Sequence, residues 1–556
     1  MRAEREAAMK QQRPVLEIKN LTVPLPLGGD RKFAVKDVSI EVAPGEVVCV
    51  VGESGSGKSI TASSVMRLGE LKPTQGSILV EGEDILAAPS RRMRELRGSR
   101  MAMIFQEPMT ALNPVYRVGD QVAELLRVHG WSGGERTRRH VERMFEDVRL
   151  PDPGRTMRAF PHQLSGGQRQ RVMIAMALSL KPALLIADEP TTALDVTTQA
   201  QILRLLKDLQ QAQGTGVMFI THDFGVVAEI ADKVVVMQGG QVVEAGPAVE
   251  VLHSPRTEYT RQLIKAIPRL VPRTSGASAG PVVLEVRDLQ KTYSVKEFMG
   301  GARTVRAVDG VSFSLMRGQT VGIVGESGSG KSTTARCIAR LIDPTDGQIV
   351  LDGTDISRLG ERPLRRYRSR LQMIFQDPYR SLNPRRKVRD SIIEGPLNFG
   401  IPMDVCLSRC RTLLKTVGLD ESALSRYPHQ FSGGQRQRIA IARALAMEPQ
   451  ILIADEAVSA LDVSIQAQVL DLLETIQTQT GISILFITHD LRVASRLCDH
   501  VLVMRNGKVV EAESTAKLFR NPAHPYTADL ISAVPGGSWL NPEAARGGSH
   551  QDDQET

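Results

Sequence analysis

The stretch VGESGSGKS occupies residues 51–59, and the same letters recur at residues 324–332. Each copy begins at the end of a short apolar run, VVCVV at 47–51 and TVGIV at 320–324. The pattern G-x-x-x-x-G-K-[ST] after a strand is typical of a phosphate-binding loop, or P-loop. Its glycines let the backbone curl so that N–H groups face phosphate oxygens, and the next helix points its positive end at the same anion. Two copies in the same context argue against a fortuitous glycine-rich turn.

Three further motifs recur in the same order. They are SGGQRQR at 165–171 and 432–438, IADE at 186–189 and 453–456, and ITHD at 220–223 and 487–490. In both copies, 23 residues separate the serine of SGGQRQR from the aspartate of IADE, and 34 separate that aspartate from the histidine of ITHD. Matched spacing of this kind indicates two copies of one module, each of about 250 residues.

Composition bounds the class of protein. The chain has 556 residues, of which 42% are hydrophobic and 24% charged, enough apolar residues for packed cores. No run approaches 18 consecutive apolar residues, so we expect no membrane span. The N-terminal residues are charged and lack an apolar core, so we expect no secretory signal.

Charge and cysteine content narrow the class further. Five scattered cysteines without a C-x-x-C pair favour a reducing cytosol and argue against a structural zinc site or a disulfide framework. A net charge of +8 favours anionic partners such as nucleotides or acidic headgroups, although a solvated surface of mixed charge explains it equally well.

Domain boundaries follow from the repeat and from a Pro-, Ser- and Gly-rich stretch. We expect a tail at 1–15, a first domain at 16–268, a linker at 269–282, a second domain at 283–535 and a second tail at 536–556. Short apolar runs alternate with helical stretches, which predicts an α/β fold with parallel strands covered on both faces. The expected strands are 47–51, 183–187 and 217–221, with counterparts at 320–324, 451–454 and 484–488.

The lysine and serine that end each P-loop have predicted roles. Lys58 and Lys331 should reach the β- and γ-phosphates of a nucleotide, and Ser59 and Ser332 should offer a hydroxyl to Mg²⁺. Further nucleotide contacts are expected from Gly52, Ser54, Gly55, Gly57 and Ile60, and from Gly325, Ser327, Gly328, Gly330 and Thr333.

An acidic pair ends a buried strand in each copy. Because neighbouring side chains at a strand end point in different directions, one carboxylate can hold the metal while the other polarises the attacking water. We expect Asp188 and Asp455 to be the metal ligands, and Glu189 and Glu456 to be the bases. The alternative is an ordinary helix cap after a strand.

The order of these motifs resembles that of the ATP-binding subunits of ABC transporters, over nearly the whole chain. FQEPMTALNP (105–114), FQDPYRSLNP (375–384) and NPAHPYT (521–527) resemble the branch that imports dipeptides, oligopeptides, glutathione or nickel, and SPRTEYT (254–260) is a degraded partner of the last. Among fused members, the chain is most similar to those of glutathione import. The resemblance implies two tandem P-loop NTPase domains, each with a parallel-sheet core, a helical subdomain and a small antiparallel β region.

The resemblance also implies roles for single residues. Gln106 and Gln376 would sense Mg²⁺ and the γ-phosphate, His222 and His489 would contact the γ-phosphate, and Asp195 and Asp462 would lie across the interface of the two halves. The signature motif would contact nucleotide through Ser165, Gly166, Gly167 and Gln168 and through Ser432, Gly433, Gly434 and Gln435. Read alone, each signature serine is equally well a plain helix N-cap. In the family arrangement, the P-loop of one half works with the signature of the other, and no required polar group is missing from either site.

Two departures from the family pattern stand out. Tyr293 occupies the position where the family stacks an aromatic ring on adenine, whereas the first half has Leu25. We therefore expect weaker adenine contact in the first half, by roughly 0.5–1.5 kcal/mol. Ala457 replaces the usual proline after the second glutamate, and we expect little effect.

Three further features resemble functional motifs, but we give them structural interpretations. Ser132–Glu135 repeats the letters SGG outside the matched spacing, and we interpret it as a polar surface turn. Cys406 and Cys410 are interpreted as packing residues. His162 and His429, just before the signatures, are interpreted as turn scaffold.

Function follows from the resemblance. We expect an ATPase, with ATP and Mg²⁺ as cofactors, that drives two integral membrane permease subunits. A periplasmic or extracellular solute-binding protein would be an indirect partner. The chain would lie peripherally on the cytoplasmic face of the bacterial inner membrane, with no nucleic acid and no metal cluster. The alternatives are a soluble tandem ATPase acting on ribosomes or nucleic acid, and a non-catalytic scaffold, which the two glutamates disfavour.

Overall fold

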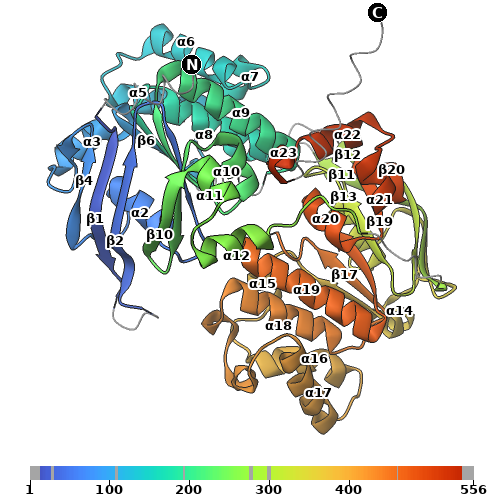
Figure 1. Cartoon of the computed structure of the whole chain (residues 1–556). Coiled ribbons are helices and arrows are strands. Elements are labelled where there is room, and N and C mark those ends of the chain that lie inside the picture. Colours follow the sequence, from blue (N-terminus) through green and yellow to red (C-terminus); the bar gives the residue numbers. More distant parts are fainter. Residues whose placement is uncertain are drawn as a thin grey trace, which may run out of the picture. The chain divides into compact units, whose positions relative to one another are not determined.

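The computed structural model describes residues 13–26, 31–106, 111–191, 194–273, 280–296, 302–459 and 461–540. The chain divides into two compact units, Met1–Ala266 with Pro535–Trp539, and Ile267–Val534 with Leu540–Thr556. Parts of the expected linker and of both expected tails lie outside the described residues. Each unit contains the same two kinds of sheet, which confirms the predicted tandem α/β architecture (Figure 1).

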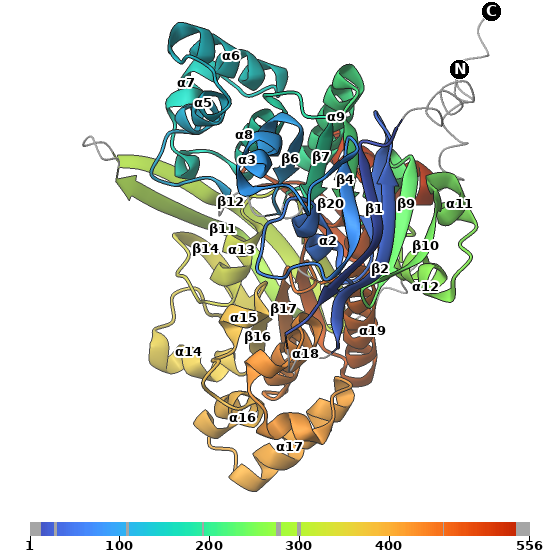
Figure 2. The same cartoon turned by 90° about the vertical axis from the view of Figure 1, so that its left-hand side faces the viewer.

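The first sheet of each unit is antiparallel and four-stranded. In unit 1 its order is β2-β1-β4-β5, and in unit 2 it is β12-β11-β14-β15. The strands are β1 (Leu16–Pro24), β2 (Phe33–Val42), β4 (Gln75–Val80), β5 (Glu83–Asp84), β11 (Val282–Lys296), β12 (Ala302–Met316), β14 (Asp346–Leu351) and β15 (Thr354–Asp355). Figure 2 shows β1, β2 and β4 side by side.

The second sheet is six-stranded and mostly parallel. Its order is β10-β9-β3-β8-β7-β6 in unit 1 and β20-β19-β13-β18-β17-β16 in unit 2, and only the last hairpin, β9–β10 or β19–β20, is antiparallel. The strands are β3 (Val47–Val51), β6 (Met101–Ile104), β7 (Leu184–Asp188), β8 (Gly216–Ile220), β9 (Lys233–Gln238), β10 (Gln241–Pro247), β13 (Thr320–Val324), β16 (Leu371–Ile374), β17 (Ile451–Asp455), β18 (Ser483–Ile487), β19 (His500–Arg505) and β20 (Lys508–Ser514). Every expected strand is present within one residue.

The helices of unit 1 cover the parallel sheet or form a separate group, α5 to α7, at one end of the unit (Figure 1). They are α2 (Lys58–Val65), α3 (Ser90–Ser99), α5 (Val118–Val128), α6 (Gly134–Asp147), α7 (Pro153–Arg158), η1 (Pro161–Gln163), α8 (Gly166–Leu178), α9 (Val196–Gln213), α10 (Phe224–Ile230), α11 (Ala248–His253) and α12 (Glu258–Ala266). The group corresponds to the helical subdomain implied by the resemblance.

Unit 2 repeats this arrangement, with α16 and α17 projecting from the sheet (Figure 2). Its helices are α13 (Lys331–Ile338), α14 (Glu361–Arg368), α15 (Pro378–Ser381), α16 (Val388–Asn398), α17 (Met403–Thr416), η2 (Glu421–Ser425), η3 (Pro428–Gln430), α18 (Gly433–Leu445), α19 (Val463–Thr480), α20 (Leu491–Leu497), α21 (Thr515–Arg520) and α22 (Pro525–Ser532).

The start of the expected C-terminal tail is structured. Helix α23 spans Gly537–Leu540, and Pro535–Trp539 is assigned to unit 1, where the Gly536 N–H donates to Glu229 Oε1 over 3.2 Å. The close approach of Pro535 to Gly225 explains why a small residue stands there, since a Cβ on Gly225 would lie 2.4 Å from the Pro535 carbonyl oxygen.

In each unit the core lies between the antiparallel sheet, the helix after the P-loop and the parallel sheet. Leu16, Val48, Ala62 and Ile186 belong to one such cluster and are fully buried. Because both faces of the parallel strands are covered, β3, β7 and β8 are buried along their whole length. This rigid sheet sets the positions of the polar residues that follow its strands.

Candidate functional site

In each unit, the P-loop connects a central parallel strand to a helix. Its first glycine lies against the end of the neighbouring strand: a Cβ on Gly52 would stand 2.2 Å from the Met237 carbonyl oxygen, and one on Gly325 would stand 2.2 Å from that of Met504. Both glycines are also in a backbone region that L side chains rarely adopt. Packing and conformation together therefore require glycine at this position.

The P-loop lysines are held by the loop itself. Lys58 Nζ donates to the carbonyl oxygens of Gly52 (2.7 Å) and Glu53 (2.9 Å), and Lys331 Nζ makes the same bonds to the second P-loop. Both lysines are largely buried. A buried ammonium ringed by carbonyl oxygens at a helix N-terminus suits an anionic ligand, because phosphate oxygens can take over from the carbonyls.

The other predicted P-loop residues lie in the same loop or the first turn of its helix. Gly55 and Gly328 face open space, since a Cβ there would meet nothing within 4 Å. The side chain of Ile60 is partly buried and packs against the hydrophobic core.

The aspartate of each acidic pair faces the P-loop serine. Ser59 Oγ donates to Asp188 Oδ1 over 3.1 Å, and Ser332 Oγ donates to Asp455 Oδ1 over 2.8 Å. Burial raises the pKa of both aspartates, which the serine bond partly offsets. A buried carboxylate next to a hydroxyl provides two hard oxygen ligands, so this pair fits Mg²⁺.

The glutamate of each pair is held by the predicted glutamine and histidine. Gln106 Nε2 donates to Glu189 Oε2 over 2.9 Å, and His222 Nδ1 lies 3.2 Å from Glu189 Oε1. In unit 2, Gln376 Nε2 donates to Glu456 Oε2 over 2.7 Å, and His489 Nδ1 lies 3.5 Å from the same oxygen. The structure thus brings together side chains from three separate motifs in each unit.

Sheet register explains this convergence. Asp188 pairs with Ile220 at the carboxyl ends of β7 and β8, and Asp455 pairs with Ile487 in β17 and β18. The residues just after these strands therefore meet at one edge of the sheet. Glu189 and Glu456 also have positive φ angles, 45° and 49°, a rare conformation for a glutamate that is common at functional sites.

The signature serines cap their own helices. Ser165 Oγ accepts from the Gln168 N–H over 3.2 Å, while the Ser165 N–H donates to Gln168 Oε1 over 2.9 Å. Ser432 and Gln435 form the same reciprocal pair in unit 2. Each signature serine is therefore a helix N-cap. The nucleotide contact that the family resemblance implies for these serines stays a prediction.

The two signature glycines differ in their surroundings. A Cβ on Gly434 would lie 2.4 Å from Ile465 Cγ2, and one on Gly167 would lie 2.6 Å from Thr198 Cγ2. A Cβ on Gly433 would meet nothing within 4 Å. Gly434 is therefore required by close packing of α18 on α19, whereas Gly433 faces open space, where a ligand can approach.

We expect Gly434→Ala to destabilise unit 2 by about 1–3 kcal/mol, because the added methyl overpacks the α18–α19 contact. Scanning calorimetry should show a fall in unfolding temperature of about 2–10 °C. Gly433→Ala is the matched control and should leave that temperature within about 1 °C of wild type, since its methyl meets open space. Equal unfolding temperatures for the two variants would contradict this packing argument.

The His489–Glu456 pair has coupled electrostatics. Burial lowers the pKa of His489, but Glu456, and to a lesser degree Asp490, raise it above 6.5 overall, against a small opposing effect of Lys331. Burial raises the pKa of Glu456, but His489 and Lys331 bring it below 4.5 overall. The pair is therefore charged on the acidic side of neutrality.

This pair predicts a pH dependence of stability. Its contribution should be complete between the ordinary pKa of glutamate, 4.5, and that of histidine, 6.5, and should be lost as pH rises through the raised pKa of folded His489. His489→Gln should lower the unfolding temperature by about 2 °C more at pH 5.5 than at pH 8.5. A His489→Gln effect on the unfolding temperature that does not depend on pH would refute the charged pair.

The structure also places three further residues from the sequence analysis, Tyr293, Asp195 and Ala457. Tyr293 lies on β11, 39% exposed, with Lys291 Nζ 5.1 Å from its ring centroid. Asp195 caps α9, where its side chain accepts from the Thr198 N–H. Ala457 is buried.

The structure also describes the cysteines, histidines and SGG letters to which no nucleotide-binding role was given. Cys406 and Cys410 are buried on α17, and His162 and His429 stack on Phe160 and Tyr427. The SGG letters before Glu135, however, open helix α6 rather than ending in a turn, and they lack the side-chain cap of the true signatures. Within the described residues, no group of three or more His, Cys, Asp or Glu side chains is placed to hold a metal ion, and no helix is long and apolar enough to span a membrane.

Sequence reasoning missed two contacts. In unit 2 the guanidinium of Arg436, in the signature helix, lies 3.8 Å from the ring centroid of Tyr379, just after Gln376. In both units a tyrosine hydroxyl reaches the P-loop from the second helix after the last hairpin, α12 or α22. The recurrence of a tyrosine in SPRTEYT and NPAHPYT is the one sequence signal that pointed to the second contact.

Comparison with known proteins agrees with this geometry. Residues 35–192 and 308–459 match the family model described as ABC transporter, and residues 243–291 and 510–547 match that described as oligopeptide/dipeptide transporter, C-terminal region. The glutathione import ATP-binding protein GsiA of Escherichia coli (strain K12) is 46% identical over 561 residues, covering 94% of this chain and 89% of that protein. The peptidoglycan transport ATP-binding protein YejF of Agrobacterium fabrum is 47% identical over 530 residues, covering 94% of this chain and 96% of that protein.

Proposed function

Because this chain belongs to the ABC transporter family, we propose that it is the ATP-hydrolysing subunit that energises a membrane importer of peptides of the oligopeptide, dipeptide or glutathione type. The observation that carries the proposal is the coincidence of two features in both halves. Each half has a complete P-loop, aspartate, glutamate, glutamine and histidine cluster, and each ends in a region that matches the oligopeptide/dipeptide transporter model.

The residues of each cluster would have separate roles in binding and hydrolysing ATP. Lys58 and the loop amides would bind the phosphates, and Ser59 with Asp188 would hold Mg²⁺, which supplies positive charge at the phosphates. Glu189 would accept a proton from the attacking water, since its carboxylate is already oriented by Gln106 and His222. The second cluster would act in the same way through Lys331, Ser332, Asp455 and Glu456.

The proposal extends to the signature motif. The signature of one half would work with the P-loop of the other, so that Ser432 serves the site of Lys58 and Ser165 serves that of Lys331. ATP binding would then close the two halves, and hydrolysis would let them part. Two integral membrane subunits at the cytoplasmic face of the inner membrane would convert that motion into passage of the substrate, delivered by an external solute-binding protein.

Co-purification tests the proposal. The chain, expressed with a cleavable tag in its own host and extracted in mild detergent, should carry two polytopic membrane proteins at a stoichiometric ratio. The alternative, a tandem ATPase acting on ribosomes or nucleic acid, requires instead that ribosomal subunits or nucleic acid co-sediment with the chain in an ATP-dependent manner. Purification with ribosomes and without membrane proteins would reject the importer function.

A further inference from the structure

A tyrosine in the C-terminal region of each unit touches the P-loop of that unit. Tyr259 lies on α12 and Tyr526 on α22. The Glu53 N–H donates to the Tyr259 hydroxyl over 3.4 Å, and the Glu326 N–H donates to the Tyr526 hydroxyl over the same distance. The flanking sequences differ, RTE before the first tyrosine and AHP before the second, so the repeated contact does not follow from local sequence identity.

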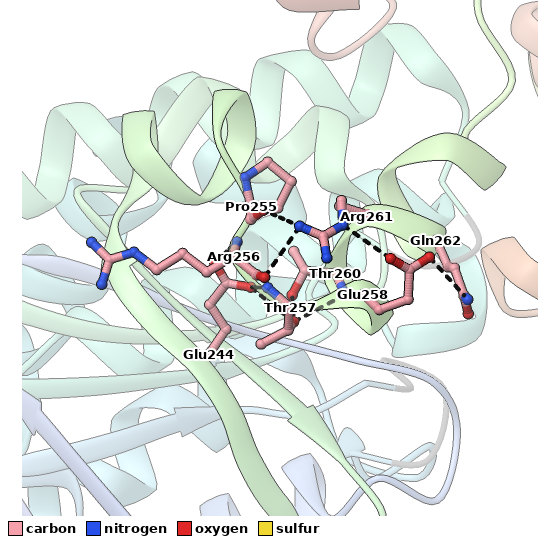
Figure 3. Close-up of polar contacts among 8 residues, drawn as sticks. All are labelled: Glu244, Pro255, Arg256, Thr257, Glu258, Thr260, Arg261 and Gln262. Atoms are coloured by element: carbon pink, nitrogen blue, oxygen red, sulfur yellow. Dashed lines mark hydrogen bonds and ion pairs between the residues drawn. The ribbon is translucent and has the colours of Figure 1, made fainter.

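A buried carboxylate fixes the helix that carries each tyrosine. Glu244, on β10, accepts hydrogen bonds from the N–H groups of Arg256 (2.8 Å) and Thr257 (3.1 Å) and from the Thr257 hydroxyl (2.9 Å), as Figure 3 shows. These donors lie at the entrance to α12, and Thr257 Oγ1 also pairs with Thr260 Oγ1 over 2.8 Å. The carboxylate therefore ties the start of the tyrosine helix to the hairpin strand β10.

Unit 2 builds the same anchor from different residues. Glu511, on β20, accepts from the N–H groups of Ala523 (2.8 Å) and His524 (3.1 Å). His524 Nδ1 then accepts from the Tyr526 N–H over 3.1 Å, in place of the threonine pair of unit 1. Because the backbone bonds are kept while the side chains change, the anchor depends on the glutamate and not on its partners.

Electrostatics keep the groups of this anchor in fixed protonation states. Burial raises the pKa of Glu244 and of Glu511, but the hydrogen bonds at the helix entrance bring both below their usual value, so both are ionised at neutral pH. Burial raises the pKa of Tyr526 to about 12, so its hydroxyl is neutral. Arg505 stacks over the Tyr526 ring at 4.6 Å and steadies it further.

The contacted residue, Glu53 or Glu326, is held at both of its backbone polar groups. Its N–H faces the tyrosine hydroxyl, and its carbonyl oxygen accepts from the P-loop lysine, over 2.9 Å at Glu53 and 2.7 Å at Glu326. The Ser56 N–H also donates to the Glu53 carbonyl oxygen over 3.1 Å, and the Ser329 N–H to that of Glu326 over 3.2 Å. When the lysine turns to phosphate, the tyrosine hydroxyl is one of the contacts that keep the first turn of the loop in place.

We propose that Tyr259 and Tyr526 are positioning residues that hold the P-loop backbone in its nucleotide-binding shape. The C-terminal region of each half, which begins with the β10 or β20 glutamate, thereby sets the affinity of that half for nucleotide. The inference rests on the proposed role of the P-loops in binding ATP. Tyrosine is suited to this task because its ring packs on the sheet while its hydroxyl reaches a backbone amide.

The test measures ADP affinity one site at a time in the full chain. Tyr259→Phe is made in a Lys331→Ala background and Tyr526→Phe in a Lys58→Ala background, so that one P-loop binds in each protein. Isothermal titration with ADP should show a dissociation constant raised about 2- to 10-fold by each phenylalanine, the loss of one hydrogen bond. Tyr367→Phe is the matched control, because Tyr367, like Tyr526, is buried but its hydroxyl accepts from Arg366 instead.

Two further readouts separate positioning from simple stability. The unfolding temperature without nucleotide should stay within about 1 °C of the parent, and in the chain with both lysines the phenylalanines should raise KM for ATP more than they change kcat. An unchanged ADP affinity, or an equal fall in unfolding temperature with and without nucleotide, would overturn the inference. If the parent proteins with one P-loop lysine bind no ADP, the proposed function itself fails, independently of the tyrosines.

Discussion

Replacing Glu189 and Glu456 together by glutamine should slow ATP hydrolysis by about 10²–10⁴-fold while ATP binding is retained. Glutamine keeps the size of the side chain and its contacts to the neighbouring glutamine and histidine, but it cannot accept a proton from water. Each glutamate has a rare backbone conformation, and a glutamine and a histidine contact its carboxylate. In Glu189 the two side chains contact different carboxylate oxygens, and in Glu456 they contact the same one. Such an arrangement fits a base held in position before the substrate arrives.

Steady-state phosphate release and nucleotide binding measure this prediction together. Glu135→Gln with Glu421→Gln is a matched control, because both are exposed glutamates paired to an arginine outside the site. The control should hydrolyse ATP at the wild-type rate. Unchanged turnover in the Glu189→Gln, Glu456→Gln protein would remove both glutamates from the role of base.

The proposed pairing of each P-loop with the signature of the other half predicts a specific pattern of nucleotide affinities in double variants. In the glutamine background, Lys58→Ala leaves one nucleotide site, that of Lys331. Adding Ser165→Ala should weaken ATP at that site by about 10- to 100-fold, the loss of a hydrogen bond to a charged group. Adding Ser432→Ala, in the same half as Lys331, should leave the affinity nearly unchanged.

The same two serine variants, made with Lys331→Ala in place of Lys58→Ala, provide the control for this comparison. With Lys331→Ala, the site of Lys58 should respond to Ser432→Ala and not to Ser165→Ala. Both serines cap their own signature helix in the same way, so the cost of losing the cap is matched between the two variants. Equilibrium binding of ATP in the presence of Mg²⁺ is the measurement. A response to the serine of the same half would mean that each half binds nucleotide alone.

Much of the fold was predictable because buried parallel strands are continuous apolar runs. VVCVV and TVGIV are strands with no exposed residue, and the motifs that follow such runs meet at one sheet edge. The duplication strengthened each prediction, since a motif seen twice at equal spacing is no accident. The resemblance implied that Gln106, Glu189 and His222 serve one site, and hydrogen bonds join Gln106 and His222 to Glu189 in the structure.

Other features carry no local signal. The positive φ of Glu189 depends on how the chain leaves β7, and glutamate gives no sequence hint of it. The contact of Tyr259 with Glu53 joins residues 206 positions apart, which no periodicity encodes. The structured residues Pro535–Trp539 were expected to end a domain and begin a loose tail, because a glycine-rich stretch with one tryptophan shows no apolar pattern.

Counting nucleotides in the Glu189→Gln, Glu456→Gln protein tests most directly whether one chain holds two working sites. After incubation with radiolabelled ATP and Mg²⁺ and removal of free nucleotide, the account predicts two ATP per chain, falling to one when either Lys58 or Lys331 is replaced by alanine. One nucleotide per chain in the protein with both lysines, or none, would contradict it.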